Sequence, residues 1–230
     1  MSRGCADILA VGLKRLGVPP EPAAIARLCR YHDELLKWSR RINLVAAAPP
    51  QELLATHFLD SLTLWPLLAS LNNRDPSYRL PLLDVGSGAG FPGLALKCWR
   101  PEALAVTLME PRLKRVSFLR HVIRTLGLHD GTVVLAQRLE PEATDDQELA
   151  GRFAVITSRA FTAIAPFLAL CAPLSPAGGR VICMKGPRAE TELAAWRQQQ
   201  PDSPYCLEQT VAFTLPFSGA CRNLLVFRKA

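Results

Sequence analysis

The sequence lacks several patterns that would define a protein class at once. None of its seven cysteines forms a Cys-x-x-Cys pair, so we predict reduced, mostly buried thiols and neither a disulfide framework nor a zinc site. The most apolar stretch, residues 161–174, contains two prolines and is too short to cross a bilayer. No signal peptide precedes the first apolar run. These absences predict a cytoplasmic protein without a membrane span.

What the chain does contain is enough apolar surface for a core and an excess of positive charge. Its 230 residues are 49% hydrophobic and 20% charged, a balance that excludes wholesale disorder. Lysine and arginine number 27 against 20 aspartates and glutamates, which gives a formal net charge of +7. This excess favours an anionic partner but carries no information about the fold.

The first 71 residues have hydrophobic periodicity of the helical kind only. We predict three helices there, separated by breaks at residues 17–20 and 46–50 that are rich in proline and other turn formers. The turn-rich run at residues 72–76 is the best candidate boundary. The sequence therefore predicts an N-terminal helical extension over residues 1–71, packed on a second domain over residues 78–230.

Beyond this boundary, short apolar runs alternate with helical segments. Predicted strands cover residues 80–85, 104–110, 132–137, 153–158 and 179–184, with helices over residues 90–99, 113–126 and 163–173 between them. Such alternation predicts an α/β protein with a mostly parallel sheet wrapped by helices. Two further strand-like runs, residues 208–214 and 223–228, are too close for a crossover helix, so this final pair should be antiparallel.

A glycine-rich turn follows the first predicted strand. Residues 84–93 read Asp-Val-Gly-Ser-Gly-Ala-Gly-Phe-Pro-Gly and lead into a helix, which lets a ligand lie against bare backbone at a helix N-terminus. Glu110 closes the next strand, where a carboxylate can accept hydrogen bonds from both hydroxyls of a ribose. A tight turn with a surface acid is the simpler interpretation, but strand, turn, helix, strand and acid occur in order.

Two cofactors compete for this turn. A nicotinamide dinucleotide is one, because residues 88–93 satisfy Gly-x-Gly-x-x-Gly, yet this match starts three residues past Val85 and has Pro92 where a pyrophosphate should approach. Asp84 suits a ligand with an ammonium group and no diphosphate, such as S-adenosylmethionine. We therefore favour a methyl donor and keep a nicotinamide-dependent small-molecule oxidoreductase as the alternative.

Six short segments share their order and spacing with one family. They are residues 35–44, 57–61, 84–93, 114–120, 157–161 and 184–186. Through them the chain resembles the bacterial 16S rRNA guanine-N7 methyltransferases, formerly called glucose-inhibited division protein B. The resemblance implies a seven-stranded Rossmann-like class I methyltransferase sheet, mostly parallel with an antiparallel last strand, preceded by the helical extension.

The same resemblance implies S-adenosylmethionine as donor, S-adenosylhomocysteine as product and no metal. It implies as acceptor a guanine in the 530 loop of 16S rRNA, free or within the small ribosomal subunit, and we expect a monomer. Carried over by motif, the donor contacts are Gly86, Phe91, Leu139, Glu140 and Arg159, which join Gly88 and Glu110 of the turn and acid. The chain departs from the family pattern at two places, with Gln137 for glycine and Glu110-Pro111 for Asp-Ser.

Four residues are candidates for the catalytic centre. His57 and Asp60 lie, with Ser61, at i, i+3 and i+4 of a predicted helix and should share one face, although a hydrogen-bonded docking patch is the simpler interpretation. Arg159 follows a buried strand, where ligand contacts gather, or it forms an ion pair with an acid such as Glu140. Lys185, one strand further on, has the same two interpretations.

The chemistry of the implied acceptor needs no base. Guanine N7 has a lone pair and no proton, so the enzyme has only to orient it and to disperse charge. The sequence has neither the Asn/Asp-Pro-Pro-aromatic motif of adenine-N6 enzymes nor the Pro-Cys nucleophile of cytosine-C5 enzymes. Basic residues cluster at residues 27–41 and 112–124, so a third hypothesis is an RNA-binding module without catalysis.

Overall fold

A computed structural model describes residues 3–71, 75, 77–140, 148–159 and 162–230. Two long helices open the chain, α1 (Arg3–Arg15) and α2 (Pro22–Ser39). The third predicted helix is broken into α3 (Pro50–Leu53), the π-helix η1 (Leu54–Leu59), α4 (Asp60–Leu62) and α5 (Trp65–Leu71). The prediction of three helices was therefore wrong, because apolar spacing does not distinguish an α turn from the wider π turn.

The sheet follows the predicted plan. It contains β1 (Leu80–Val85), β2 (Leu104–Met109), β3 (Thr132–Leu135), β4 (Val155–Arg159), β5 (Arg180–Lys185), β6 (Tyr205–Thr214) and β7 (Cys221–Lys229). The strand order is β3-β2-β1-β4-β5-β7-β6, and β7 alone runs antiparallel to both of its neighbours. The seven-stranded, mostly parallel sheet and the antiparallel final pair are thus confirmed.

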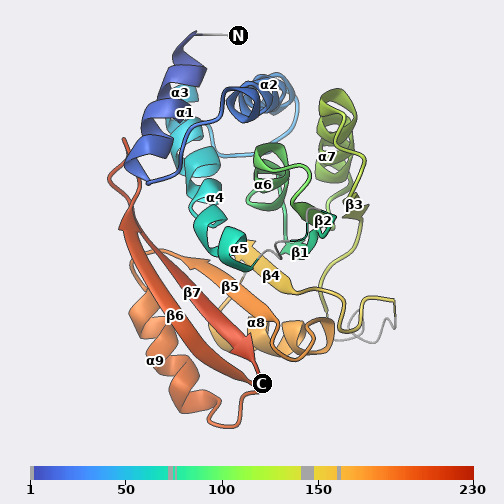
Figure 1. Cartoon of the computed structure of the whole chain (residues 1–230), viewed down its shortest axis with the longest axis vertical. Coiled ribbons are helices and arrows are strands. Elements are labelled where there is room, and N and C mark those ends of the chain that lie inside the picture. Colours follow the sequence, from blue (N-terminus) through green and yellow to red (C-terminus); the bar gives the residue numbers. More distant parts are fainter. Residues whose placement is uncertain (1–2, 72–74, 76, 141–147, 160–161) are drawn as a thin grey trace.

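Helices cover both faces of this sheet (Figure 1). On one face lie α6 (Gly93–Trp99) and α7 (Leu113–Leu126), and on the other α8 (Ile164–Cys171) and α9 (Ala189–Gln199). Sequence analysis missed α9, because only Ala189, Leu193 and Trp196 of it are buried and its apolar stripe is weak.

Two hydrophobic cores result, one on each face. Because successive side chains of a strand point to opposite faces, Leu82 packs under the N-terminal helices and Leu83 packs under α8 and α9. The first core joins Leu9 and Leu28 of the opening helices to the sheet, so these helices share the sheet's core. The division into an extension over residues 1–71 and a domain over residues 78–230 stays a prediction.

The cysteine prediction needs correction. Cys5 of α1 and Cys29 of α2 form a disulfide, which joins the two opening helices across 24 residues of sequence. Packing of two helices brings this pair together, and no sequence motif marks it. Three of the remaining cysteines are buried thiols, as predicted, while Cys206 and Cys221 are exposed. No helix in the described part of the chain is long and apolar enough to cross a membrane.

Candidate functional site

The glycine turn lies at the carboxyl end of β1, and its glycines serve different purposes. Gly86, Gly88 and Gly90 have φ values of 71°, 59° and 94°, in the left-handed region that favours glycine. A Cβ atom at Gly90 would collide with Tyr31 and Leu94, whereas one at Gly88 would meet nothing nearer than 3.7 Å. Gly90 therefore allows tight packing against α2, and Gly88 leaves space beside its backbone.

Glu110 reaches across from the end of β2 to this turn. Its carboxylate accepts hydrogen bonds from the backbone N–H of Gly88 at 2.8 Å and from that of Arg112 at 2.9 Å, and the Arg115 guanidinium lies 3.9 Å away. The side chain is 3% exposed, so its position is fixed. Each carboxylate oxygen still has a lone pair for a further donor. Contact between Glu110 and a ribose stays a prediction.

Asp84 lies in β1, directly before the glycine turn. Its side chain is fully buried, and its Oδ2 accepts a hydrogen bond from the backbone N–H of Gly93, at the start of α6, at 2.9 Å. Burial raises the pKa of Asp84 to about 7. Its Oδ1 is buried without a hydrogen-bond partner among the described residues, and the expectation that this carboxylate suits a ligand's ammonium group stays a prediction.

The Phe91 ring fastens the turn to the N-terminal helices. It is buried and stacks on Tyr31, with centroids 5.5 Å apart, and on His57, with centroids 5.1 Å apart. The Tyr31 hydroxyl donates a hydrogen bond to the Ala89 carbonyl within the turn. Through these contacts α2 supports the turn from below, and a donor contact with Phe91 stays a prediction.

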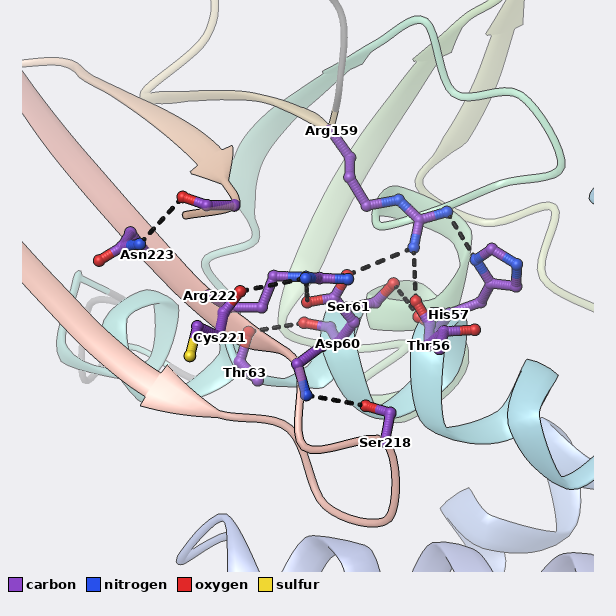
Figure 2. A network of polar contacts seen from close by, with 12 residues as sticks. Thr56, His57, Asp60, Ser61, Thr63, Arg159, Ser218, Cys221, Arg222 and Asn223 are labelled. Carbon is purple, nitrogen blue, oxygen red and sulfur yellow. Dashed lines mark hydrogen bonds and ion pairs between the residues drawn. The ribbon is translucent and has the colours of Figure 1, made fainter. Parts of the chain in front are cut away.

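A second group of polar residues gathers around Arg159, at the end of β4 (Figure 2). The guanidinium donates to the Thr56 carbonyl at 3.0 Å, to His57 Nδ1 at 2.9 Å and to Asp60 Oδ2 at 3.5 Å. Arg222 of β7 lies on the other side of Asp60, with its Nε 3.4 Å from the carboxylate. We call His57, Asp60, Arg159 and Arg222 the arginine cluster. Ser61 donates to the His57 carbonyl and takes no part in it.

Burial controls the charges in the arginine cluster. It raises the pKa of Asp60, which is 1% exposed, while the two guanidinium groups oppose that rise. Burial, together with the charges of Arg159 and Arg222, lowers the pKa of His57 to about 3. The imidazole is thus neutral at pH 7, and its Nδ1 is the acceptor because a guanidinium can only donate. The cluster therefore presents two cations around one carboxylate and no free base.

The structure corrects one expectation about this region and adds one residue that the sequence did not indicate. Arg159 pairs with Asp60, not with Glu140, because Glu140 is exposed and lies 3.5 Å from Arg138. Sequence analysis also missed Arg222, which belongs to no recognisable motif and reaches Asp60 from a strand 162 residues away. Leu139 is buried in the core under α8 and α9, and its predicted donor contact is untested.

Lys185 lies outside the arginine cluster. Its ammonium group donates to the Thr162 carbonyl at 2.6 Å and pairs with Glu192 of α9 at 2.7 Å. Among the described residues, no group of three or more His, Cys, Asp or Glu side chains could hold a metal ion.

The two basic segments predicted separately come together beside the turn. Two neighbouring hollows, of about 570 and 510 Å³, share Arg41 and Ile42 and are bordered by the end of α2 and the start of α7. We call this the basic surface. Its cationic members are Lys37, Arg40, Arg41, Arg112, Lys114 and Arg115. Since Arg115 also lies 3.9 Å from Glu110, the basic surface adjoins the glycine turn.

A seven-stranded sheet with one reversed strand, a glycine turn after β1 and an acid at the end of β2 define a class I methyltransferase fold. Solved structures share it. A predicted O-methyltransferase from Agrobacterium tumefaciens superposes with a TM-score of 0.55 at 19% identity, over 71% of this chain and 79% of the other. Geranyl diphosphate methyltransferase in complex with SAM gives 0.52 at 14% identity, over 74% and 85%.

Sequence comparison narrows the class further. The chain belongs to the rRNA small subunit methyltransferase G family, whose model matches residues 24–224. A relative of that name from Desulfotalea psychrophila is 40% identical over 99% of this chain and 96% of its own length. Another from Syntrophotalea carbinolica is 38% identical over 94% of both chains. The predicted family resemblance is thus confirmed.

Proposed function

We propose that this protein transfers a methyl group from S-adenosylmethionine to N7 of a guanine in the 530 loop of 16S rRNA. The observation that carries the proposal is the hydrogen bond between Glu110 and Gly88, which holds an acid from β2 against the glycine turn of β1. The names of the relatives support the same class of reaction.

The residues around the turn fit this donor. No atom lies nearer than 3.7 Å to where a Cβ of Gly88 would stand, which lets a ligand approach the backbone, and Glu110 keeps lone pairs for two ribose hydroxyls. When bound, S-adenosylmethionine supplies a methyl group on a positively charged sulfur. The residues that would hold it are Gly86, Gly88, Phe91, Glu110, Leu139, Glu140 and Arg159.

The arginine cluster suits an acceptor that has no proton to lose. His57 is neutral and its Nδ1 is occupied, and Asp60 is enclosed between two guanidinium groups, so neither is placed as a general base. Guanine N7 needs none. In this proposal Arg159 orients the acceptor by donating to its O6, which leaves the N7 lone pair free to attack, while Asp60 and His57 hold the guanidinium in place.

The basic surface supports RNA as the partner. Six cations around two adjoining hollows provide a track for phosphates, which is the sequence-independent part of RNA binding. The proposal includes a monomer acting on 16S rRNA, either free or within the small ribosomal subunit, and it includes no metal.

Methyl transfer from labelled donor tests the proposal. Wild-type protein is incubated with undermethylated 16S rRNA or small subunits, and the modified base is mapped. We expect label at N7 of one guanine in the 530 loop. Label at an adenine or a cytosine would refute the acceptor assignment. Binding of a nicotinamide dinucleotide without affinity for S-adenosylmethionine would refute the assignment of the methyl donor. Salt-sensitive RNA binding without any methyl transfer would favour the hypothesis of an RNA-binding module without catalysis.

A further inference from the structure

A cleft lies at the carboxyl ends of β4 and β5, outside the glycine turn and the arginine cluster. It has a volume of about 650 Å³ and is bordered by the segment before α8, the segment after β5 and the first turns of α9. Asn223 of β7 donates a hydrogen bond at 3.1 Å to the carbonyl of Gly186, one of the lining residues. The lining residues that matter below are Thr162, Lys185 and Glu192.

One ion pair provides the polar groups of this cleft. Lys185 Nζ lies 2.7 Å from Glu192 Oε2, and the two side chains are only 12% and 29% exposed. Lys185 also donates to the Thr162 carbonyl at 2.6 Å, which leaves its third N–H without an acceptor among the residues the structure describes. Glu192 Oε2 is buried and, apart from this ion pair, has no hydrogen-bond partner among the same residues. The pair therefore presents one unused donor next to a carboxylate with unused lone pairs.

We propose that this cleft holds the acceptor guanine by its Watson–Crick edge. That edge carries two adjacent donors, N1–H and the 2-amino group, beside the acceptor O6. The Glu192 carboxylate can accept from both donors, and the Lys185 ammonium can donate to O6. Bases lifted out of a nucleic acid are commonly read in this manner.

The pair also discriminates against the other bases. Adenine offers an acceptor at N1 and a C–H at position 2, so its edge would leave the carboxylate facing a lone pair. Cytosine likewise offers an acceptor at N3, and uracil has a single N–H between two carbonyls. A half-buried carboxylate left without donors is costly, which makes the site selective for guanine.

This position of the guanine adds a substrate site to the proposed methyl transfer, and the inference rests on that proposed function. The cleft follows β4 and β5, and the glycine turn follows β1; β4 is the neighbour of β1 in the sheet, and β5 lies on the far side of β4. Holding the Watson–Crick edge leaves N7 free, because N7 lies on the opposite side of O6 from N1. Glu192 and Lys185 are thereby assigned to substrate recognition and not to the donor.

Inosine tests the assignment without any mutation. It keeps N7, O6 and N1–H of guanine but lacks the 2-amino group. Small subunits carrying a single inosine at the mapped guanine should be methylated by wild-type protein with a kcat/KM at least fivefold lower than normal subunits. If wild-type protein methylates guanine and inosine equally, this inference falls while the proposed methyltransferase stands. If guanine is not methylated at all, both fall.

Two glutamates of α9 provide a matched pair of variants. Glu192→Gln keeps one acceptor for Lys185 but offers guanine a donor where it needs an acceptor, so kcat/KM should fall about tenfold and the preference for guanine over inosine should disappear. Glu190→Gln changes a neighbouring acid that does not line the cleft and should behave as wild type.

Calorimetry with S-adenosylhomocysteine and a melting curve complete the test. Both variants should bind this product as wild type does and melt at the same temperature. An unchanged guanine preference in Glu192→Gln would overturn the proposal, as would a loss of S-adenosylhomocysteine binding in that variant, because the cleft would then serve the donor.

Discussion

The glycine turn and the arginine cluster lie near the same edge of the sheet, yet they are built by different kinds of contact. Glu110 and Gly88 are 22 residues apart, and the donor in their hydrogen bond is the backbone. Asp60 meets Arg159 and Arg222 across 99 and 162 residues, through side chains alone. The acid and the glycine of the turn therefore come from one strand-helix-strand unit, whereas the cluster depends on three distant elements folding together.

Substitution at Gly86 should have the largest effect, and it should be confined to the turn. Valine at this left-handed position would fill space that a ligand needs, so we expect Gly86→Val to lose measurable affinity for S-adenosylmethionine in calorimetry. Gly127→Val is the matched control, since Gly127 has a similar φ of 66° and its Cβ would meet no atom. Both variants pay the same backbone strain of about 1–2 kcal/mol. Normal binding of S-adenosylmethionine by Gly86→Val would refute the glycine turn as its binding site.

Removing the carboxylate should break the arginine cluster. Asp60→Asn leaves two partly buried guanidinium groups without their buried counter-charge, and we expect the free energy of unfolding in urea to fall by about 3 kcal/mol. Asp130→Asn is the control, because Asp130 pairs with Arg79 while 79% exposed, so its substitution should cost much less stability than that of Asp60. Equal losses in the two variants would show that the cluster is no more than a surface ion pair.

Arg159→Ala should separate activity from stability. Asp60 keeps Arg222 as a partner in this variant, so the protein should remain folded with a smaller loss of stability than Asp60→Asn. Methyl transfer should fall about 100-fold, as when one oriented donor is removed from an active site. Lysine should not restore it, because an ammonium cannot span the three acceptors that the guanidinium contacts. Full activity in Arg159→Ala would exclude the arginine from the site.

The two regions should respond to pH with opposite sign. His57 binds a proton near pH 6.5 when unfolded but only near pH 3 when folded, so its contribution to stability is lost as pH falls below 6.5, by about 2 kcal/mol at pH 5. Asp84, with its pKa raised to about 7, binds protons more tightly when folded. Its contribution is therefore lost as pH rises from about 4 through 7.

Single variants separate the contributions of His57 and Asp84 to the pH dependence of stability. The two effects oppose each other between about pH 4 and pH 6.5, so urea denaturation at several pH values should show that His57→Gln leaves the fall in stability with rising pH that Asp84 causes, and that Asp84→Asn leaves the rise that His57 causes. In each variant, the pH dependence of stability that the unmutated group causes should remain. If neither variant changes the dependence of the free energy of unfolding on pH, the burial that shifts these two pKa values does not persist in solution.

The same contrast explains what could be predicted from sequence. The strands, the glycine turn and the position of Glu110 follow from local periodicity and from spacing within one strand-helix-strand unit. The partner of Arg159, the role of Arg222 and the disulfide between Cys5 and Cys29 depend on packing between distant elements, which no local pattern records. The π-helix was missed because a one-residue widening of a turn hardly changes an apolar stripe.

The hydrogen bond from Tyr31 to the Ala89 carbonyl has a consequence for shortened forms of the protein. Because the tyrosine is fully buried and its ring packs on Phe91, deleting the first 40 residues would uncover an aromatic surface directly beneath the glycine turn. We therefore expect the opening helices to be required for the stability of the glycine turn. A chain begun at residue 41 should precipitate or lose its ligand, even though it would retain every residue of the glycine motif.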